Sequence, residues 1–251
     1  MKKNLVFVIT IIILLLTNSK ISFGKNHKPS KILILGDSHS IETFGITLHK
    51  LFQEKNEVRS VAICGASART FLAKRMYSKC GSRITYTTLD KKWNYKSTLQ
   101  KKRNNQSIIA RILSGKNIGK RKKTLPEFKP NIVIISMGTN NNYFGFSKIK
   151  MQNLITATGA SKCILIGPPK LPKDSKWKNK YILKNSKKSL KRIYRREKKV
   201  NIQMSNIKEC TFIDSKKIMI KPPYGNIHYG KHNAKKWAKG VFIKIRKLLH
   251  K

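Results

Sequence analysis

Four residues spread along the chain carry groups that could do chemistry together. Ser38 supplies a hydroxyl and His228 an imidazole. Gly65 supplies a backbone N–H that a ligand can approach closely, and Asn140 supplies an amide donor. Acyl transfer needs a serine hydroxyl with an imidazole to take its proton, and N–H donors to stabilise the oxyanion that follows. The four residues could support this chemistry if the fold brings them together.

The hydrophobic pattern predicts the elements that must position these residues. Five short apolar runs predict β-strands at residues 32–35, 58–63, 132–136, 163–166 and 211–213. Helical stretches separate them, and an apolar stripe over 234–248 predicts a terminal helix. Strands that alternate with helices indicate a parallel sheet covered on both faces. We therefore expect an α/β fold: a three-layer α/β/α sandwich with a flavodoxin-like, five-stranded parallel sheet.

The positions of the four residues suit such a sheet. Ser38, Gly65 and Asn140 each follow a predicted strand, and His228 stands just before the terminal helix. In open parallel sheets, active sites lie beyond the carboxyl ends of the strands. The four segments, taken in order, resemble the Ser, Gly, Asn and His blocks of the SGNH/GDSL hydrolase family, and the likeness covers nearly all of the chain after residue 24.

The resemblance implies a role for each residue. Ser38 would be the nucleophile and His228 the base. The backbone N–H groups of Ser38 and Gly65, with the Asn140 side chain, would form the oxyanion hole. Each residue also has an ordinary structural explanation: Ser38 could cap a helix, Gly65 and Asn140 could belong to turns, and His228 could lie on the surface.

One residue of the family pattern is missing. The family usually carries an Asp three residues before its catalytic His, and that position here is Gly225. Asp214, after the fifth predicted strand, could orient the His228 ring instead, or a backbone carbonyl could do so. A further alternative is that catalysis has been lost and the site only binds.

The N-terminus predicts export. Lys2 and Lys3 precede a twelve-residue apolar run at 5–16, and Ser22 and Gly24 are small residues suited to cleavage. We therefore expect a signal peptide at 1–24 and an SGNH/GDSL-like domain at 25–251, periplasmic or secreted. An uncleaved membrane anchor is the alternative reading.

The cysteines agree with an oxidising compartment. The spacings of Cys64, Cys80, Cys163 and Cys210 do not resemble a zinc site, so two disulfides are expected. Cys64 with Cys80 would close a loop, and Cys163 could lie beside Cys210 in neighbouring strands. Buried free thiols remain the alternative. The sequence contains no metal-ligand cluster and no nucleotide-binding loop, so we expect no metal and no cofactor.

The charge needs a separate explanation. The chain has 56 Lys and Arg against 10 Asp and Glu, a net charge of +46, and two basic insertions are expected near 91–124 and 170–199. An AT-rich genome would raise Lys, Asn and Ile, but would not by itself remove acidic residues. In an exported monomer the expected partners are acylated anionic glycans, other envelope polymers or a membrane surface, and not nucleic acid.

These observations predict an exported serine esterase. Its substrate would be a small acyl ester, such as O-acetyl, on an anionic envelope or host glycan. One alternative is an O-acetyltransferase that uses the same Ser38 and His228, because Gly-Asp-Ser-His also occurs in SGNH domains that acetylate polysaccharides. A non-catalytic glycan-binding domain is the other, and it alone predicts that Ser38→Ala leaves function intact.

Overall fold

The computed structural model describes residues 29–76, 78, 80–90, 94–99, 104–116, 118, 124–138, 140, 145–219, 221 and 228–249. The predicted signal peptide and Gly225 lie outside these residues. None of the helices in the described ranges is long and apolar enough to cross a membrane.

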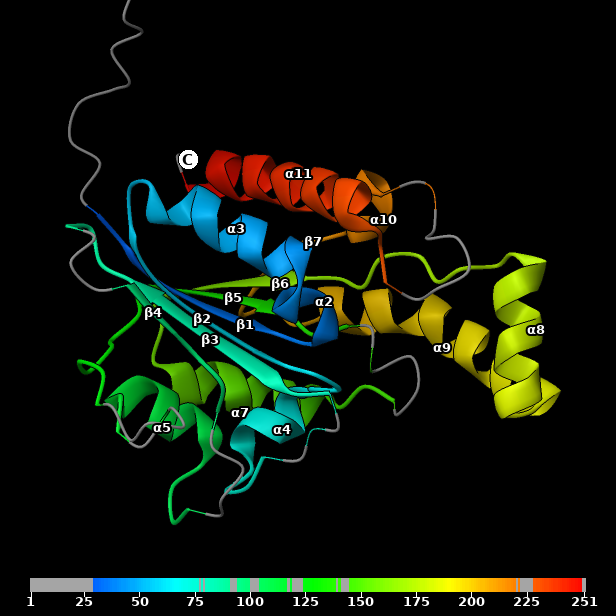
Figure 1. Ribbon diagram of the computed structural model, residues 1–251, viewed down its shortest axis with the longest axis horizontal. Coiled ribbons are helices and arrows are strands. Elements are labelled where there is room, and N and C mark those ends of the chain that lie inside the picture. The colour runs from blue at the N-terminus through cyan, green and yellow to red at the C-terminus, as the bar shows by residue number, and fades with distance from the viewer. Residues whose placement is uncertain are drawn as a thin grey trace, which may run out of the picture.

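A central sheet of seven strands organises the chain, in the order β4-β3-β2-β1-β5-β6-β7 (Figure 1). The strands are β1 (Lys31–Gly36), β2 (Glu57–Ile63), β3 (Ser82–Thr87), β4 (Asn94–Ser97), β5 (Ile132–Ser136), β6 (Lys162–Ile166) and β7 (Thr211–Ile213). All five predicted strands are confirmed, and they pair in parallel as β2-β1-β5-β6-β7. Counted along the chain, these five have the flavodoxin-like order 2-1-3-4-5.

The predicted sheet was too small by two strands. β3 pairs antiparallel to β2, and β4 pairs antiparallel to β3, so the sheet is mixed at this edge. Both strands alternate polar with apolar residues or carry basic ones, and they therefore lack the continuous apolar run of a strand buried on both faces. The α/β class itself is confirmed.

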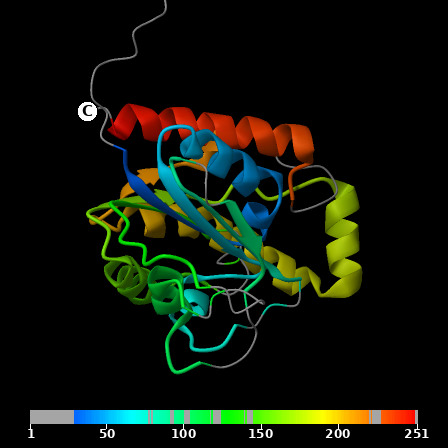
Figure 2. The ribbon, with the colours of Figure 1, turned by 60° about the vertical axis from the view of Figure 1, so that its left-hand side comes forward.

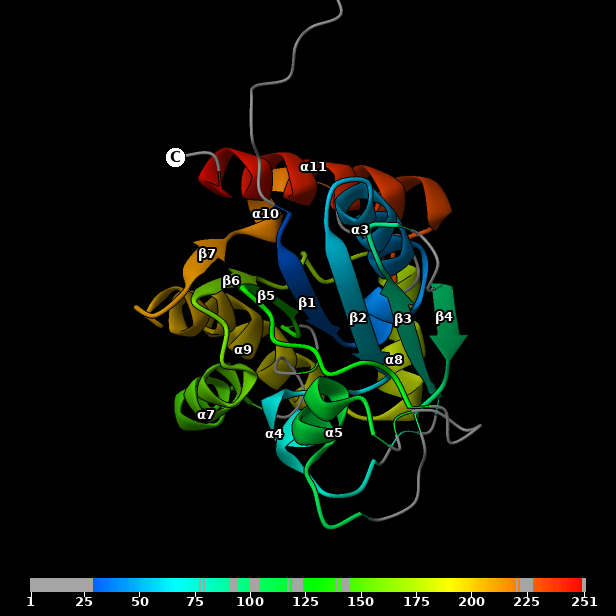
Figure 3. The ribbon, with the colours of Figure 1, turned by 90° about the vertical axis from the view of Figure 1, so that its left-hand side faces the viewer.

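Helices cover both faces of the sheet (Figure 2). On one face lie α2 (Ser38–Ile41), α3 (Thr43–Gln53), α10 (Ser215–Ile218) and α11 (Lys231–Leu249). On the other lie α4 (Ala68–Leu72), α5 (Ile108–Ser114), α7 (Lys148–Thr158) and α9 (Lys187–Ser205), while α8 (Ser175–Lys184) projects to one side. Alternate residues of β1 enter opposite cores: Leu33 packs below the sheet, and Ile34 packs beneath α3 and α11 (Figure 3).

The terminal helix α11 closes the first of these layers. Its apolar stripe is buried as predicted, with Ala234, Trp237 and Val241 among its buried residues. Trp237 stacks on Phe44 of α3, with ring centroids 3.8 Å apart. This packing fixes α11, and with it the position of His228 just before the helix begins.

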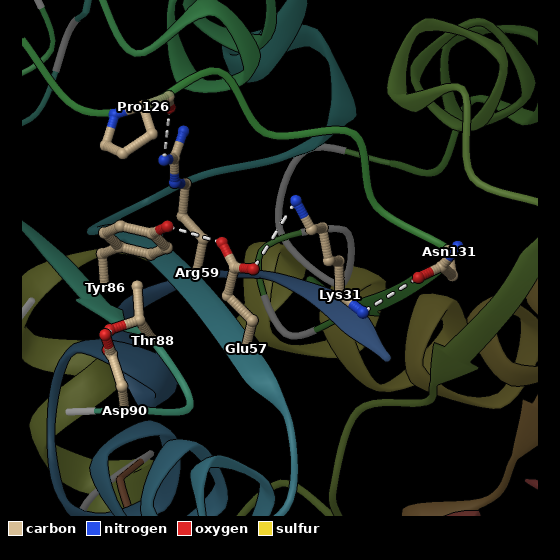
Figure 4. Close-up of polar contacts among 8 residues, drawn as sticks. All are labelled: Lys31, Glu57, Arg59, Tyr86, Thr88, Asp90, Pro126 and Asn131. Carbon is tan, nitrogen blue, oxygen red and sulfur yellow. Dashed lines mark hydrogen bonds and ion pairs between the residues drawn. The ribbon is translucent and has the colours of Figure 1, made fainter. Parts of the chain in front are cut away.

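Part of the predicted insertion at 91–124 belongs to the core. α5 buries Ile108 and Ile112 against the sheet. Arg59 of β2 is fully buried, and its Nη1 donates to the Ile112 carbonyl at 2.5 Å. Its Nη2 donates to the Pro126 carbonyl at 2.8 Å (Figure 4). The guanidinium therefore fastens α5 and the segment after it to the sheet.

Two aromatic rings and a carboxylate complete the Arg59 cluster. The Arg59 Cζ lies 4.5 Å from the Tyr86 ring centroid and 4.6 Å from that of Phe128. The Tyr86 hydroxyl donates to Glu57 at 2.5 Å, and Glu57 pairs with Lys31 at 3.6 Å (Figure 4). Burial lowers the pKa of Arg59 to about 10, so the guanidinium remains charged at neutral pH.

The second basic segment forms two helices, α8 and α9. Leu190 and Ile193 of α9 are buried, and the Lys and Arg residues between them are exposed. Leu183 lies on α8 and is 90% exposed. The break near Ser186, whose side chain caps α9, separates the two helices.

Both expected disulfides are present. Cys64 pairs with Cys80, and Cys163 pairs with Cys210. The second disulfide joins β6 to the start of β7, two neighbouring parallel strands, as expected from the sequence.

Candidate active site

The turn after β1 places Ser38 at the carboxyl edge of the sheet. Asp37 is the N-cap of α2, and its side chain accepts a hydrogen bond from the His39 N–H at 3.1 Å. The Asp37 N–H donates to the Ser136 carbonyl at the end of β5, at 3.2 Å. These contacts hold Ser38, the first residue of α2, between the ends of two central strands.

Ser38 and His228 meet across 190 residues of sequence. The Ser38 Oγ lies 3.1 Å from the His228 Nε2, within hydrogen-bonding distance. Ser38 is buried, whereas the His228 side chain keeps 26% of its surface exposed. The imidazole can therefore accept the serine proton while one side of the pair remains open to a ligand.

Glu42 brings a carboxylate close to His228. Its Oε2 lies 3.8 Å from the His228 Nδ1, on the opposite side of the ring from Ser38. Glu42 stands between α2 and α3, four residues after Ser38. Sequence reasoning missed it, although a carboxylate about one helical turn from the serine was the signal that could have found it.

Asp214 does not take this position. Its side chain accepts hydrogen bonds from the Lys216 N–H at 2.9 Å and from the Asn201 amide at 3.0 Å, and it caps α10. The expectation that Asp214 orients His228 is therefore wrong. A short helix begins directly after β7, so its N-terminal N–H groups engage the carboxylate.

The Gly65 and Asn140 segments are joined to each other. The Asn140 Nδ2 donates to the Ala66 carbonyl at 3.0 Å, next to Gly65. Gly65 has a φ of +79°, a conformation that favours glycine and turns the chain sharply after β2. Because an amide nitrogen carries two hydrogens, Asn140 can serve Ala66 and still offer a donor to a ligand.

His39 lies beside the pair, as expected of a neighbour to the site. Its ring centroid is 4.7 Å from that of His228 and 5.6 Å from that of Trp237. Burial, together with the nearby His228, lowers the pKa of His39 to about 3. His39 is therefore neutral at physiological pH and adds no charge next to His228.

Within the described part of the chain, no group of three or more His, Cys, Asp or Glu side chains is placed to hold a metal ion. The groups that meet at the carboxyl edge are a hydroxyl, an imidazole, a carboxylate and N–H donors. Such a set suits nucleophilic attack on a carbonyl carbon.

The chain matches no protein-family model and no curated protein sequence. It superposes on solved structures. A carbohydrate acetylesterase family member from Sinorhizobium meliloti has a TM-score of 0.52 and 11% identity, over 88% of this chain and 100% of that one. A DUF4886 family protein from Bacteroides uniformis has a TM-score of 0.49 and 14% identity, over 86% and 82% of the two chains. An inhibitor-bound aryl esterase from M. smegmatis has a TM-score of 0.48 and 14% identity, over 87% and 99%.

The first superposition carries the structural comparison, because it spans the whole of that chain with a TM-score above 0.5. At 11% identity it speaks to the arrangement of the elements alone. This chain therefore shares the α/β fold of that carbohydrate acetylesterase family member, and its Ser, Gly, Asn and His segments resemble the SGNH/GDSL blocks.

Proposed function

We propose that this protein is an exported SGNH-type serine hydrolase that removes small acyl groups, such as O-acetyl, from an anionic glycan of the cell envelope or a host. The observation that carries the proposal is the 3.1 Å contact between the Ser38 Oγ and the His228 Nε2 at the carboxyl edge of the sheet. Residues so distant in sequence meet here in the geometry that activates a serine.

The reaction follows from these groups. His228 takes the proton of Ser38 at Nε2 as the Oγ attacks the ester carbonyl carbon. The tetrahedral oxyanion receives hydrogen bonds from the N–H groups of Ser38 and Gly65 and from the Asn140 amide. When the C–O bond to the alcohol breaks, His228 returns the proton to the leaving oxygen. Water, deprotonated by His228, then attacks the acyl carbonyl carbon. As the acyl–Oγ bond breaks, His228 returns that proton to Ser38, and the acyl group leaves as the free acid.

Glu42 has a positioning role in this scheme. Its carboxylate near the His228 Nδ1 favours the tautomer that leaves Nε2 free to accept a proton, and it stabilises the imidazolium that forms. Because Glu42 is 62% exposed, water screens its charge. We therefore assign it a smaller contribution than a buried carboxylate would make.

The substrate class rests on charge and on fold-level analogy. A net charge of +46 attracts polyanions, and an exported protein meets these as envelope or host glycans. A carbohydrate acetylesterase family member shares the fold, which agrees with an acylated sugar as substrate. Two disulfides and a predicted signal peptide support export.

Turnover of a short-chain nitrophenyl ester tests the proposal. The full chain is produced in an oxidising compartment beside Ser38→Ala and His228→Ala, with Ser205→Ala and His232→Ala as matched surface controls. We expect each site variant to lose activity by about 1,000-fold or more, with folding and both controls unchanged. A folded wild-type protein as inactive as Ser38→Ala would contradict hydrolysis, and unchanged glycan binding by Ser38→Ala would favour a binding domain.

A further inference from the structure

A cavity lies between α3 and the strands β2, β3 and β4. Its volume is about 160 Å³, which is room for a small polar group and not only for one water molecule. The walls come from three strands and two helices, α2 and α3, so the tertiary fold shapes the cavity.

Three basic side chains line the cavity: Lys50 from α3, Arg83 from β3 and Lys96 from β4. No acidic residue is among the lining residues, and no carboxylate of the described ranges forms an ion pair with any of the three. The three cations come from separate elements and line one concave surface. Together they create a positive electrostatic potential that attracts an anion.

Neutral hydrogen-bonding groups form the floor of the cavity. The buried His49 bonds to the Ser60 hydroxyl through Nδ1 at 2.7 Å and to the Thr87 hydroxyl through Nε2 at 3.0 Å. Burial, with the charges of Lys96 and Arg83, lowers the pKa of His49 to about 4. The positive charges of Lys96 and Arg83 therefore lie near His49, and His49 itself stays neutral at physiological pH.

Thr85 is another neutral residue that lines the cavity. It pairs across the sheet with Ser60 on one side and with Lys96 on the other. Hydroxyl groups beside cations are the donors that complete the binding of an oxyanion.

The cavity adjoins the segment that carries the proposed nucleophile. Ser40, two residues after Ser38, is one of its lining residues. The Arg83 Nη1 donates to the Ile41 carbonyl at 2.8 Å, which ties β3 to the stretch between Ser38 and Glu42. A ligand held by Arg83 therefore lies beside the candidate active site and not at a remote surface.

We infer that this cavity is a binding subsite for a compact oxyanion: a carboxylate, sulfate or phosphate group held by Lys50, Arg83 and Lys96. The group can come from the acylated polymer or from a free anion. Its assignment to the polymer rests on the proposed function, whereas anion binding itself does not.

Titration of the full chain with inorganic phosphate, followed by calorimetry, tests anion binding. The variant pairs Lys50→Gln with Lys96→Gln, because both side chains are exposed and their loss leaves the core intact. The control pairs Lys244→Gln with Lys247→Gln, an equal charge change at the exposed far end of α11. We expect saturable binding by wild type and control, weakened at least tenfold in the cavity variant. Equal binding by all three would overturn the subsite.

A second arm decides the source of the anion. Initial rates are compared on a neutral nitrophenyl ester and on an O-acetylated acidic polysaccharide. The cavity variant should keep the neutral-ester rate and show a KM for the acidic polymer raised about tenfold. An unchanged KM would overturn the link to the polymer, and a wild type inactive on both esters would overturn the proposed function. Whichever of these results is obtained, the phosphate titration alone decides whether the cavity binds an anion.

Discussion

Arg59 and Ser38 are both buried polar groups, but their hydrogen-bond partners differ in exposure to solvent. Arg59 directs its two terminal nitrogens to the Ile112 and Pro126 carbonyls, and aromatic rings surround its guanidinium. Ser38 contacts His228, which is one-quarter exposed and reaches on to the largely exposed Glu42. Enclosed partners stabilise the chain, whereas partners open to solvent leave room for a substrate.

The two regions should respond differently to substitution. Changes in the Arg59 cluster should alter stability and leave the chemistry of folded molecules intact. Changes around Ser38 should alter turnover and leave stability nearly intact. Stability and turnover should therefore change independently of each other in variants of the two regions.

Arg59→Ala should give the largest effect on stability. The substitution removes the donors to two buried carbonyls and leaves a cavity between the sheet and α5, so we expect a loss of about 3–4 kcal/mol in the free energy of unfolding. Urea denaturation measures this, with the exposed Arg69→Ala as control. Unchanged stability, or a fall in turnover per folded molecule, would contradict the structural role.

Asn140→Ala should lower kcat by about 100-fold or more, because one oxyanion donor is lost. The substitution also removes the hydrogen bond to the Ala66 carbonyl, for which we expect a stability cost of only about 1 kcal/mol. Steady-state kinetics and thermal denaturation on the same samples separate the two effects. A loss of activity that merely follows a loss of folded protein would count against an oxyanion role.

Stability should fall as the pH drops from about 6.5 towards 4. The pKa of His39 is lowered to about 3 and that of His49 to about 4, so the unfolded chain binds protons that the folded chain does not. Each histidine contributes at most about 1.4 kcal/mol per pH unit in this window. His49→Gln should reduce the slope by up to that amount, and the exposed His232→Gln should not. Equal slopes would show that His49 does not titrate as described.

Glu42→Gln should have the smallest effect, a fall in kcat of about tenfold, because the carboxylate is exposed and 3.8 Å from the His228 ring. Asp214→Asn is the matched control and should leave kcat unchanged. A larger loss with Asp214→Asn than with Glu42→Gln would reverse this assignment.

The sequence could predict the elements that carry their own hydrophobic signal. The five parallel strands have short apolar runs, α11 has an apolar stripe, and Cys163 and Cys210 each stand at the start of a strand. These features are local, so no tertiary contact is needed to read them.

The features that escaped prediction depend on contacts between distant segments. Strands β3 and β4 are partly polar, and they extend the parallel sheet on one side, with β4 as the edge strand. A charged Arg59 is not expected in an apolar strand. Only the folded chain brings the carbonyls of α5 and of the segment after it to the guanidinium, where they accept its hydrogen bonds. Asp214 is the acidic residue nearest to His228 in sequence, but the α2–α3 junction places the Glu42 carboxylate 3.8 Å from the His228 ring.

In the proposed reaction, Ser38 is a nucleophile that His228 activates. Labelling with a fluorophosphonate tests it most directly, because such reagents modify activated serines whatever the natural acyl acceptor. We predict one adduct per folded chain, mapped by mass spectrometry to Ser38, absent in Ser38→Ala and strongly slowed in His228→Ala. Two results would contradict a nucleophilic Ser38. Either the folded wild-type protein takes no label, or the wild type and Ser38→Ala are labelled at the same other residue and at the same rate.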